Sequence, residues 1–94
     1  MIILNGPDKT YELKPSLQLV AALESVHGSL YQLAEELLDK TLPLSEMIDV
    51  MKMLYRHAGC VAELDDFLLR QPCTELLITF LLEVIGPWRR GLSS

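Results

Sequence analysis

The stretch from Leu76 to Ile85 constrains the fold of this chain more than any other, because it is apolar except for Thr79 and Glu83. Thr74 before it is a suitable helix N-cap, and Gly86-Pro87 after it predicts a firm stop. A helix that is apolar on nearly all sides lies at the centre of a core or is buried in an interface. The stretch is far shorter than the roughly 20 apolar residues that a membrane span needs.

The whole chain shows the same excess of apolar residues. It has 94 residues, of which 50% are hydrophobic and only 22% are charged. A domain this small has a large surface for its volume and should need more polar residues to cover it. The composition therefore excludes disorder and indicates that part of the apolar surface contacts a partner or a second copy. Since aromatic residues make up only 6%, leucine and methionine carry the apolar content, which favours helices.

The N-terminal residues predict a β-hairpin. Met1–Asn5 is a short apolar run, Gly6-Pro7 begins a turn, and Thr10–Leu13 alternates polar and apolar residues. Pro15 ends the second strand. Because a lone hairpin is marginally stable in water, we expect it to pack on the helices or to join another sheet edge.

Four or five short helices are predicted for the rest of the chain. Ser16 caps the first, which ends at Gly28, and Ser29 opens the second in a capping box with Gln32. Ser45 caps the third. Apolar residues recur in these helices at helical spacing. They are Leu19, Val20, Leu23 and Val26 in the first helix; Leu30, Leu33, Ala34, Leu37 and Leu38 in the second; Met47, Val50, Met51, Leu54 and Ala58 in the third; and Leu64, Phe67 and Leu68 in a fourth over about Ala62 to Arg70.

These elements predict a mainly α fold, a compact bundle of four or five short helices with an N-terminal β-hairpin. The length of the chain predicts a single domain, which we place at residues 1–86. The hairpin takes up residues 1–14 and the helical bundle residues 16–86. A C-terminal tail over residues 87–94 carries the adjacent Arg89 and Arg90.

The charge of the chain narrows its range of partners. It has 8 Lys and Arg against 13 Asp and Glu, a net charge of −5, so it repels phosphate backbones and nucleic-acid binding is disfavoured. The N-terminus lacks the basic flank of a signal peptide. Two cysteines are too few for the disulfide framework of a small secreted domain. We therefore expect a cytoplasmic protein without a membrane partner.

The sequence contains little that could carry chemistry. His27, His57, Cys60 and Cys73 could form a His2Cys2 metal set, but they come from different elements and lack the paired spacing of zinc sites. We interpret them as helix-end histidines and buried thiols. The chain has no GxSxG elbow, phosphate-binding loop or dinucleotide fingerprint. We expect no metal, no cofactor and no enzymatic activity.

Ser29 leaves an alternative function open. Gly28-Ser29-Leu30 opens a helix in a small acidic helical chain, and acyl carrier proteins carry phosphopantetheine on a serine in such a place. That family has an Asp where this chain has Gly28, and it lacks the N-terminal hairpin. Helix capping accounts for the serine fully. A helical module that dimerises or regulates is a further alternative.

A protein-binding surface is predicted on the third and last helices. Met47, Met51 and Met53 cluster on the third helix, and Met-rich faces adapt readily to partners. Met53 and Tyr55 widen the apolar arc of this helix beyond one stripe, which is the better indication of an interface. The candidate contact residues are Met47, Met51, Met53, Tyr55, Leu76, Phe80 and Trp88.

A series of short motifs gives the chain a resemblance to a known family. These are Leu4-Asn5-Gly6, Tyr11 to Leu17, Leu23-Glu24, Gly28-Ser29-Leu30 with Leu33, and then Met51, Tyr55 and Ala58-Gly59. Over roughly residues 1 to 60 the chain resembles the small tail proteins of phages and gene transfer agents, described as tail assembly chaperones or tail tube components. Beyond that point only the helical character is shared, and Pro87 to Ser94 has no counterpart.

The resemblance implies a non-enzymatic role in the assembly of a phage or prophage tail inside a bacterial host cell. It implies that the chain binds the hydrophobic tape-measure protein, and in some cases the tube subunit. A mainly helical chain suits a chaperone better than a tube subunit, since tube subunits are typically rich in β-strands. Capture of a partner helix in an apolar groove would use the excess of apolar residues, and so would a homo-oligomer.

Overall fold

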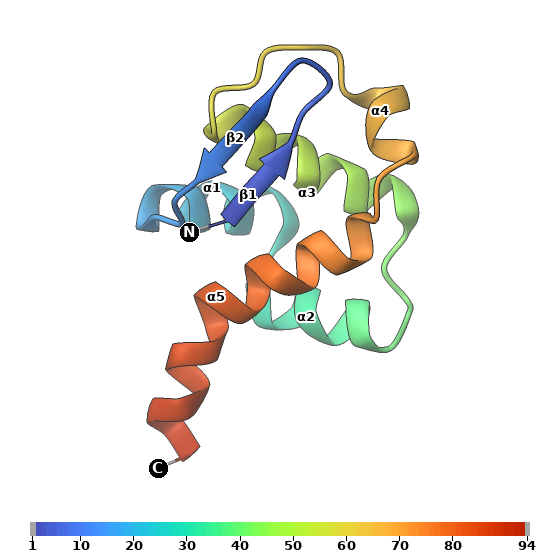
Figure 1. Ribbon diagram of the computed structural model, residues 1–94. Coiled ribbons are helices and arrows are strands. Elements are labelled where there is room, and N and C mark those ends of the chain that lie inside the picture. The colour runs from blue at the N-terminus through green and yellow to red at the C-terminus, as the bar shows by residue number, and fades with distance from the viewer. Residues whose placement is uncertain (1, 94) are drawn as a thin grey trace.

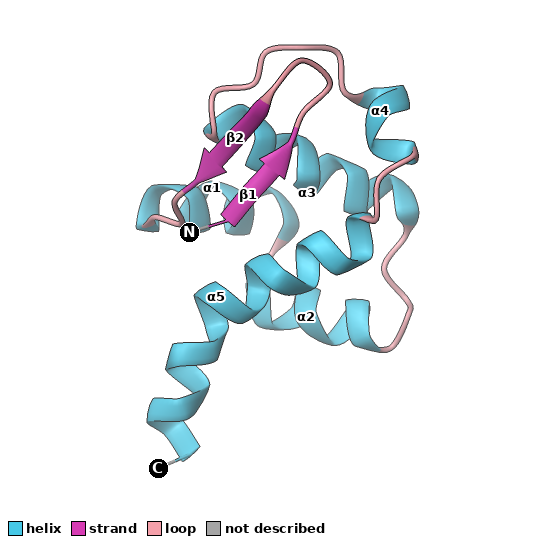
Figure 2. Ribbon diagram, viewed as in Figure 1, coloured by secondary structure: helices cyan, strands magenta, loops and turns pink. Residues whose placement is uncertain are grey.

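The computed structural model describes the backbone of residues 2–93 and the side chains of residues 2–85. Its elements follow the predicted order of a hairpin and then helices (Figures 1 and 2). They are β1 (Ile2–Asn5), β2 (Thr10–Leu13), α1 (Leu17–His27), α2 (Leu30–Leu38), α3 (Leu44–His57), α4 (Asp65–Leu69) and α5 (Cys73–Ser93). The prediction of a mainly α fold with an N-terminal β-hairpin is confirmed.

The hairpin has one buried face and one exposed face. β1 and β2 pair antiparallel, with Leu4 opposite Tyr11 and Ile2 opposite Leu13, and these four side chains are buried. The turn requires a glycine at position 6, because a Cβ there would lie 2.7 Å from the carbonyl oxygen of Lys9. β2 lies against α3, so the hairpin packs on the helices as expected (Figure 1).

Serine side chains cap the first two helices, as the sequence predicts. The Oγ of Ser16 accepts a hydrogen bond from the Leu19 amide at 3.2 Å, and the Oγ of Ser29 accepts one from the Tyr31 amide at 3.2 Å. Gly28, with a φ of 82°, ends α1. The capping box at Ser29 does not form in full, because the Gln32 side chain donates instead to Glu36 one turn later, at 3.4 Å.

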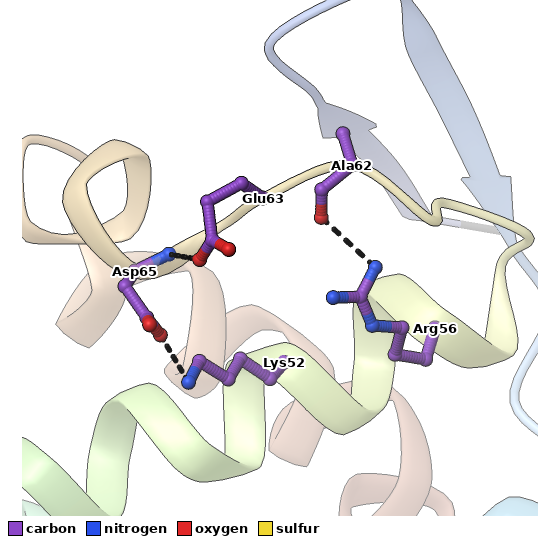
Figure 3. A network of polar contacts seen from close by, with 5 residues as sticks. All are labelled: Lys52, Arg56, Ala62, Glu63 and Asp65. Atoms are coloured by element: carbon purple, nitrogen blue, oxygen red, sulfur yellow. Dashed lines mark hydrogen bonds and ion pairs between the residues drawn. The ribbon is translucent and has the colours of Figure 1, made fainter.

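The middle of the chain departs from the predicted helix boundaries. α3 begins at Leu44 with Pro43 as its N-cap, so Ser45 lies inside the first turn. α4 begins only at Asp65, because the preceding loop is held out of a helix. One guanidinium nitrogen of Arg56 donates to two carbonyl oxygens of this loop, those of Cys60 and Ala62, at 2.9 Å each. Figure 3 shows the bond to Ala62.

The last helix is longer at both ends than the sequence predicts. α5 begins at Cys73, one residue before the expected cap Thr74, and it continues through Gly86-Pro87 to Ser93. A proline inside a helix removes one backbone hydrogen bond and bends the helix without always ending it. Figure 1 shows α5 changing direction and its C-terminal part extending away from the other elements. The predicted stop is therefore wrong, and the expected tail is helical as far as Ser93.

Tyr55 joins the hairpin to the helices at the centre of the core. Its side chain is fully buried and lies edge-on to the Phe67 ring, with ring centroids 6.3 Å apart. Its hydroxyl donates a hydrogen bond of 2.8 Å to the carbonyl oxygen of Asn5 at the end of β1. Burial raises the pKa of Tyr55 to about 12. The neutral phenol therefore holds a donor in the core at physiological pH.

We predict that Tyr55→Phe lowers the free energy of unfolding by about 1–2 kcal/mol, because the substitution removes one hydrogen bond and leaves the Asn5 carbonyl without this partner. Urea unfolding followed by circular dichroism measures this. Tyr31→Phe is the matched control, since Tyr31 is 48% exposed. Equal stability of Tyr55→Phe and the wild type would contradict the assignment.

Candidate protein-binding groove

Most of the predicted contact residues lie in the core instead of on the surface. Met47, Met51, Tyr55 and Phe80 are buried, and Met53 and Leu76 are partly buried and packed against the core. Trp88 falls on a part of α5 whose side chains lie outside those described. α3 therefore does not present these residues as an exposed surface, and their role in binding a partner stays a prediction. α3 packs against β2, α1, α4 and α5, and these neighbours cover the wide apolar arc.

Four of the nine exposed large apolar side chains among the described residues lie around two hollows elsewhere on the molecule. Among the described residues, Leu17 on α1, Tyr31 and Leu38 on α2 and Leu82 on α5 are 83%, 48%, 69% and 64% exposed. All four line one of two neighbouring hollows in the surface. Isolated exposed leucines are ordinary, but several around one depression indicate a contact site.

The larger hollow, of about 530 Å³, lies where the beginnings of α1 and α2 meet the second half of α5. α1 contributes Leu17 and Val20, while α2 contributes Leu30 and Tyr31. The position of α1 follows from its capping by Ser16, which itself lines the hollow. The lining residues are Pro15, Ser16, Leu17, Val20, Glu24, Leu30, Tyr31, Glu83, Val84 and Ile85.

The smaller hollow, of about 80 Å³, continues along the seam between α2 and α5. Its described lining is wholly apolar and consists of Ala34, Leu37, Leu38, Ile78, Leu81, Leu82 and Ile85. Ile85 lines both hollows, so they are neighbours, and we call the two together the apolar groove. α2 and α5 line both hollows, and α1 also lines the larger one.

The charged groups among the described residues that line the apolar groove are acidic. Glu24 and Glu83 line the larger hollow, and no described lining residue is basic. Glu24 accepts a hydrogen bond of 3.2 Å from the Leu30 amide, which fixes its carboxylate beside the start of α2. An apolar segment that also carries Lys or Arg would match this surface in both hydrophobicity and charge.

α5 explains why the sequence pattern did not reveal the groove. Its apolar residues divide into an inner side, with Leu77, Phe80 and Leu81 buried, and an outer side on which Leu82 is exposed and Ile78 partly so. The helix is thus neither central nor wholly buried. The adjacent pair Leu37-Leu38 could have indicated an exposed leucine on α2. Neighbouring residues on a helix point about 100° apart, so the two cannot both face the middle of one core.

Three of the groups considered for chemistry, Cys60, Cys73 and Ser29, are buried or make structural contacts. Cys60 and Cys73 are free and buried, and the Cys73 thiol donates to the Leu68 carbonyl at 3.2 Å. Burial raises the pKa of the Cys73 thiol, which disfavours a nucleophilic thiolate. The Ser29 hydroxyl caps α2. Among the described side chains, no three His, Cys, Asp or Glu residues lie where they could hold a metal ion.

A polar network holds α4 and its preceding loop onto α3 (Figure 3). Lys52 on α3 forms an ion pair with Asp65, the first residue of α4. The hydrogen bond from Lys52 holds the pKa of the Asp65 carboxyl below its usual value. Glu63 accepts a hydrogen bond from the Asp65 amide at 3.3 Å. These contacts lie away from the residues that line the apolar groove.

Comparison with known proteins gave no match to a family model, a curated protein or a solved structure. Within the described part of the chain, no helix combines the length and the hydropathy needed to cross a membrane.

We predict that the two sides of α5 respond differently to truncation. Phe80→Ala should lower the free energy of unfolding by about 3–5 kcal/mol, because it leaves a cavity in the core. Leu82→Ala should change it by no more than about 0.5 kcal/mol, because Leu82 is exposed. Urea titrations of the two variants measure this. Similar losses in both would mean that the outer side of α5 is covered.

We predict a pH-dependent effect of Asp65→Asn. Because the pKa of Asp65 is lowered in the folded state, its ion pair stabilises the fold above its ordinary pKa of about 3.9, and the contribution is lost as the pH falls through the folded pKa. The wild type should therefore exceed Asp65→Asn in stability at pH 7, and the difference should shrink as the pH falls below about 3.9. Asp66→Asn, at the neighbouring exposed position, is the control. A difference that is independent of pH would contradict the assignment.

Proposed function

We propose that the protein is a non-enzymatic protein-binding factor in the assembly of a phage, prophage or gene-transfer-agent tail. Its role is that of a tail assembly chaperone in the cytoplasm of the host cell, with the tape-measure protein as its partner. The resemblance over roughly residues 1 to 60 supports the tail context. The mainly helical fold, with one hairpin, supports a chaperone over a β-rich tube subunit.

The apolar groove is the observation that carries the binding role. A small chain that leaves Leu17, Leu38 and Leu82 exposed around one depression loses stabilisation relative to a chain that buries them. Such a surface is retained when a partner covers it. The smaller hollow lies between two helices, α2 and α5, and a groove between helices accepts the apolar side of another helix.

The proposed occupant is an amphipathic helix with basic residues beside its apolar stripe. Tape-measure proteins, as the family resemblance implies, are long, helical and hydrophobic, so they supply apolar helices that need cover before assembly. The carboxylates of Glu24 and Glu83 would select segments that carry Lys or Arg, and the net charge of −5 would steer them toward the groove.

We predict that Leu38→Asp combined with Leu82→Asp weakens binding to tape-measure segments about tenfold or more, because the change places two charges in the apolar contact. Pull-down, followed by calorimetry on overlapping tape-measure segments, measures this. Val61→Asp combined with Leu69→Asp is the matched control, since both residues are exposed and neither lines the groove. Binding that is equal in the two double variants would place the contact elsewhere, and a wild type that binds no segment would overturn the proposal.

A further inference from the structure

A serine and a histidine meet where the beginning of α1 lies against the end of α3. The Oγ of Ser16 is 3.5 Å from Nε2 of His57, although the two residues are 41 positions apart in the chain. We propose that Ser16 is an acyl-acceptor site, whose hydroxyl uses His57 as a base to take a short aliphatic acyl group from an activated ester. This covalent modification goes beyond the proposed binding role and does not depend on it.

The contacts of the Ser16 hydroxyl leave its proton available to His57. The oxygen caps α1 by accepting a hydrogen bond from the Leu19 amide, so the hydroxyl hydrogen is not used in capping. Nε2 of a neutral His57 is an acceptor when the ring carries its proton on Nδ1. The hydroxyl can therefore donate to Nε2. The pair has the arrangement of a nucleophile beside its base, at the longer distance that is common before a substrate binds.

The ends of two helices favour the transfer of this proton. Ser16 is the N-cap of α1, where the helix dipole and the amides of the first turn stabilise negative charge on the oxygen. His57 is the last residue of α3, where the opposite end of a helix dipole stabilises a positive imidazolium. Both helices thus stabilise the charges that arise when the proton moves from Oγ to Nε2.

The larger hollow of the apolar groove adjoins this serine and supplies a place for the acyl chain. Ser16 lines the hollow together with Leu17, Val20, Leu30 and Tyr31. Its volume of about 530 Å³ lies within the range of about 300–1,000 Å³ that is typical of small-molecule sites. A mostly apolar lining favours the ester of an aliphatic acid over a charged or sugar substrate, because polar groups would lose their hydration there.

The transfer exchanges one ester bond for another and needs no cofactor. Oγ of Ser16 attacks the acyl carbon, and the hydroxyl proton passes to Nε2 of His57. The amides of Leu17 and Gln18 in the first turn of α1 have no acceptor within the helix, so they can donate to the carbonyl oxygen as it becomes negative. The bond from the acyl carbon to the leaving oxygen then breaks, and the leaving group takes the proton from His57. The products are O-acyl-Ser16 and a free alcohol.

Incubation of the full chain with p-nitrophenyl butyrate tests the proposal. We expect release of p-nitrophenol and the addition of a butyryl group, which peptide mass spectrometry should place on Ser16. His57→Gln should lower the rate of this reaction about a hundredfold, because the base is lost. Ser16→Ala should abolish it but also removes a helix cap. Ser16→Asp keeps a capping oxygen without a hydroxyl, so it should be folded and unreactive at this position.

Ser29 is a matched control within the same chain. It caps α2 through a hydrogen bond of 3.2 Å from the Tyr31 amide, but among the described residues no histidine is bonded to it. Equal labelling of Ser16 and Ser29, or no labelling of Ser16, overturns the proposal, and so does a His57→Gln variant that reacts as fast as the wild type. Circular dichroism of each variant shows that it is folded. Because no tape-measure segment is present, these results are independent of the test of the proposed function.

Discussion

The packing around α3 is the constraint on which the rest of the structure depends. This helix contacts β2, α1, α4 and α5, and Val50, Met51 and Tyr55 on it are fully buried. A helix with neighbours on several sides needs an apolar surface wider than one stripe. The wide arc of α3 is therefore used within the molecule. The exposed apolar surface lies instead at the periphery of the molecule, where α2 and α5 line the apolar groove.

Local signals allowed most of the fold to be predicted from the sequence. Ser16, Ser29 and Gly28 mark helix ends through their own backbone chemistry, so they are readable without knowledge of any other element. The alternation in Thr10–Leu13 likewise marks a strand with one buried side. Such features depend on neighbours in the chain, which the sequence displays directly.

The candidate site could not be predicted in this way, because exposure depends on what another element covers. The sequence pattern predicts Tyr55 as a contact residue on its helix, yet the N-terminal hairpin lies over it. Leu38 and Leu82 matched core patterns, yet both lie at the rim of the seam between α2 and α5. Pro87 predicted a stop, yet a helix can bend at a proline and continue. None of these outcomes is set by sequence spacing alone.

The hydrogen bond between Tyr55 and Asn5 joins residues 50 positions apart, and this has a consequence for synthesis. The hairpin leaves the ribosome first, but the helix that covers its buried side is completed only after Tyr55 has emerged. A two-stranded hairpin alone is marginally stable, and incomplete chains with uncovered apolar strands tend to aggregate. At roughly 5–20 residues per second the interval lasts a few seconds. Translation pauses between residues 13 and 55 would therefore expose Ile2, Leu4 and Leu13 for longer and lower the yield of folded protein.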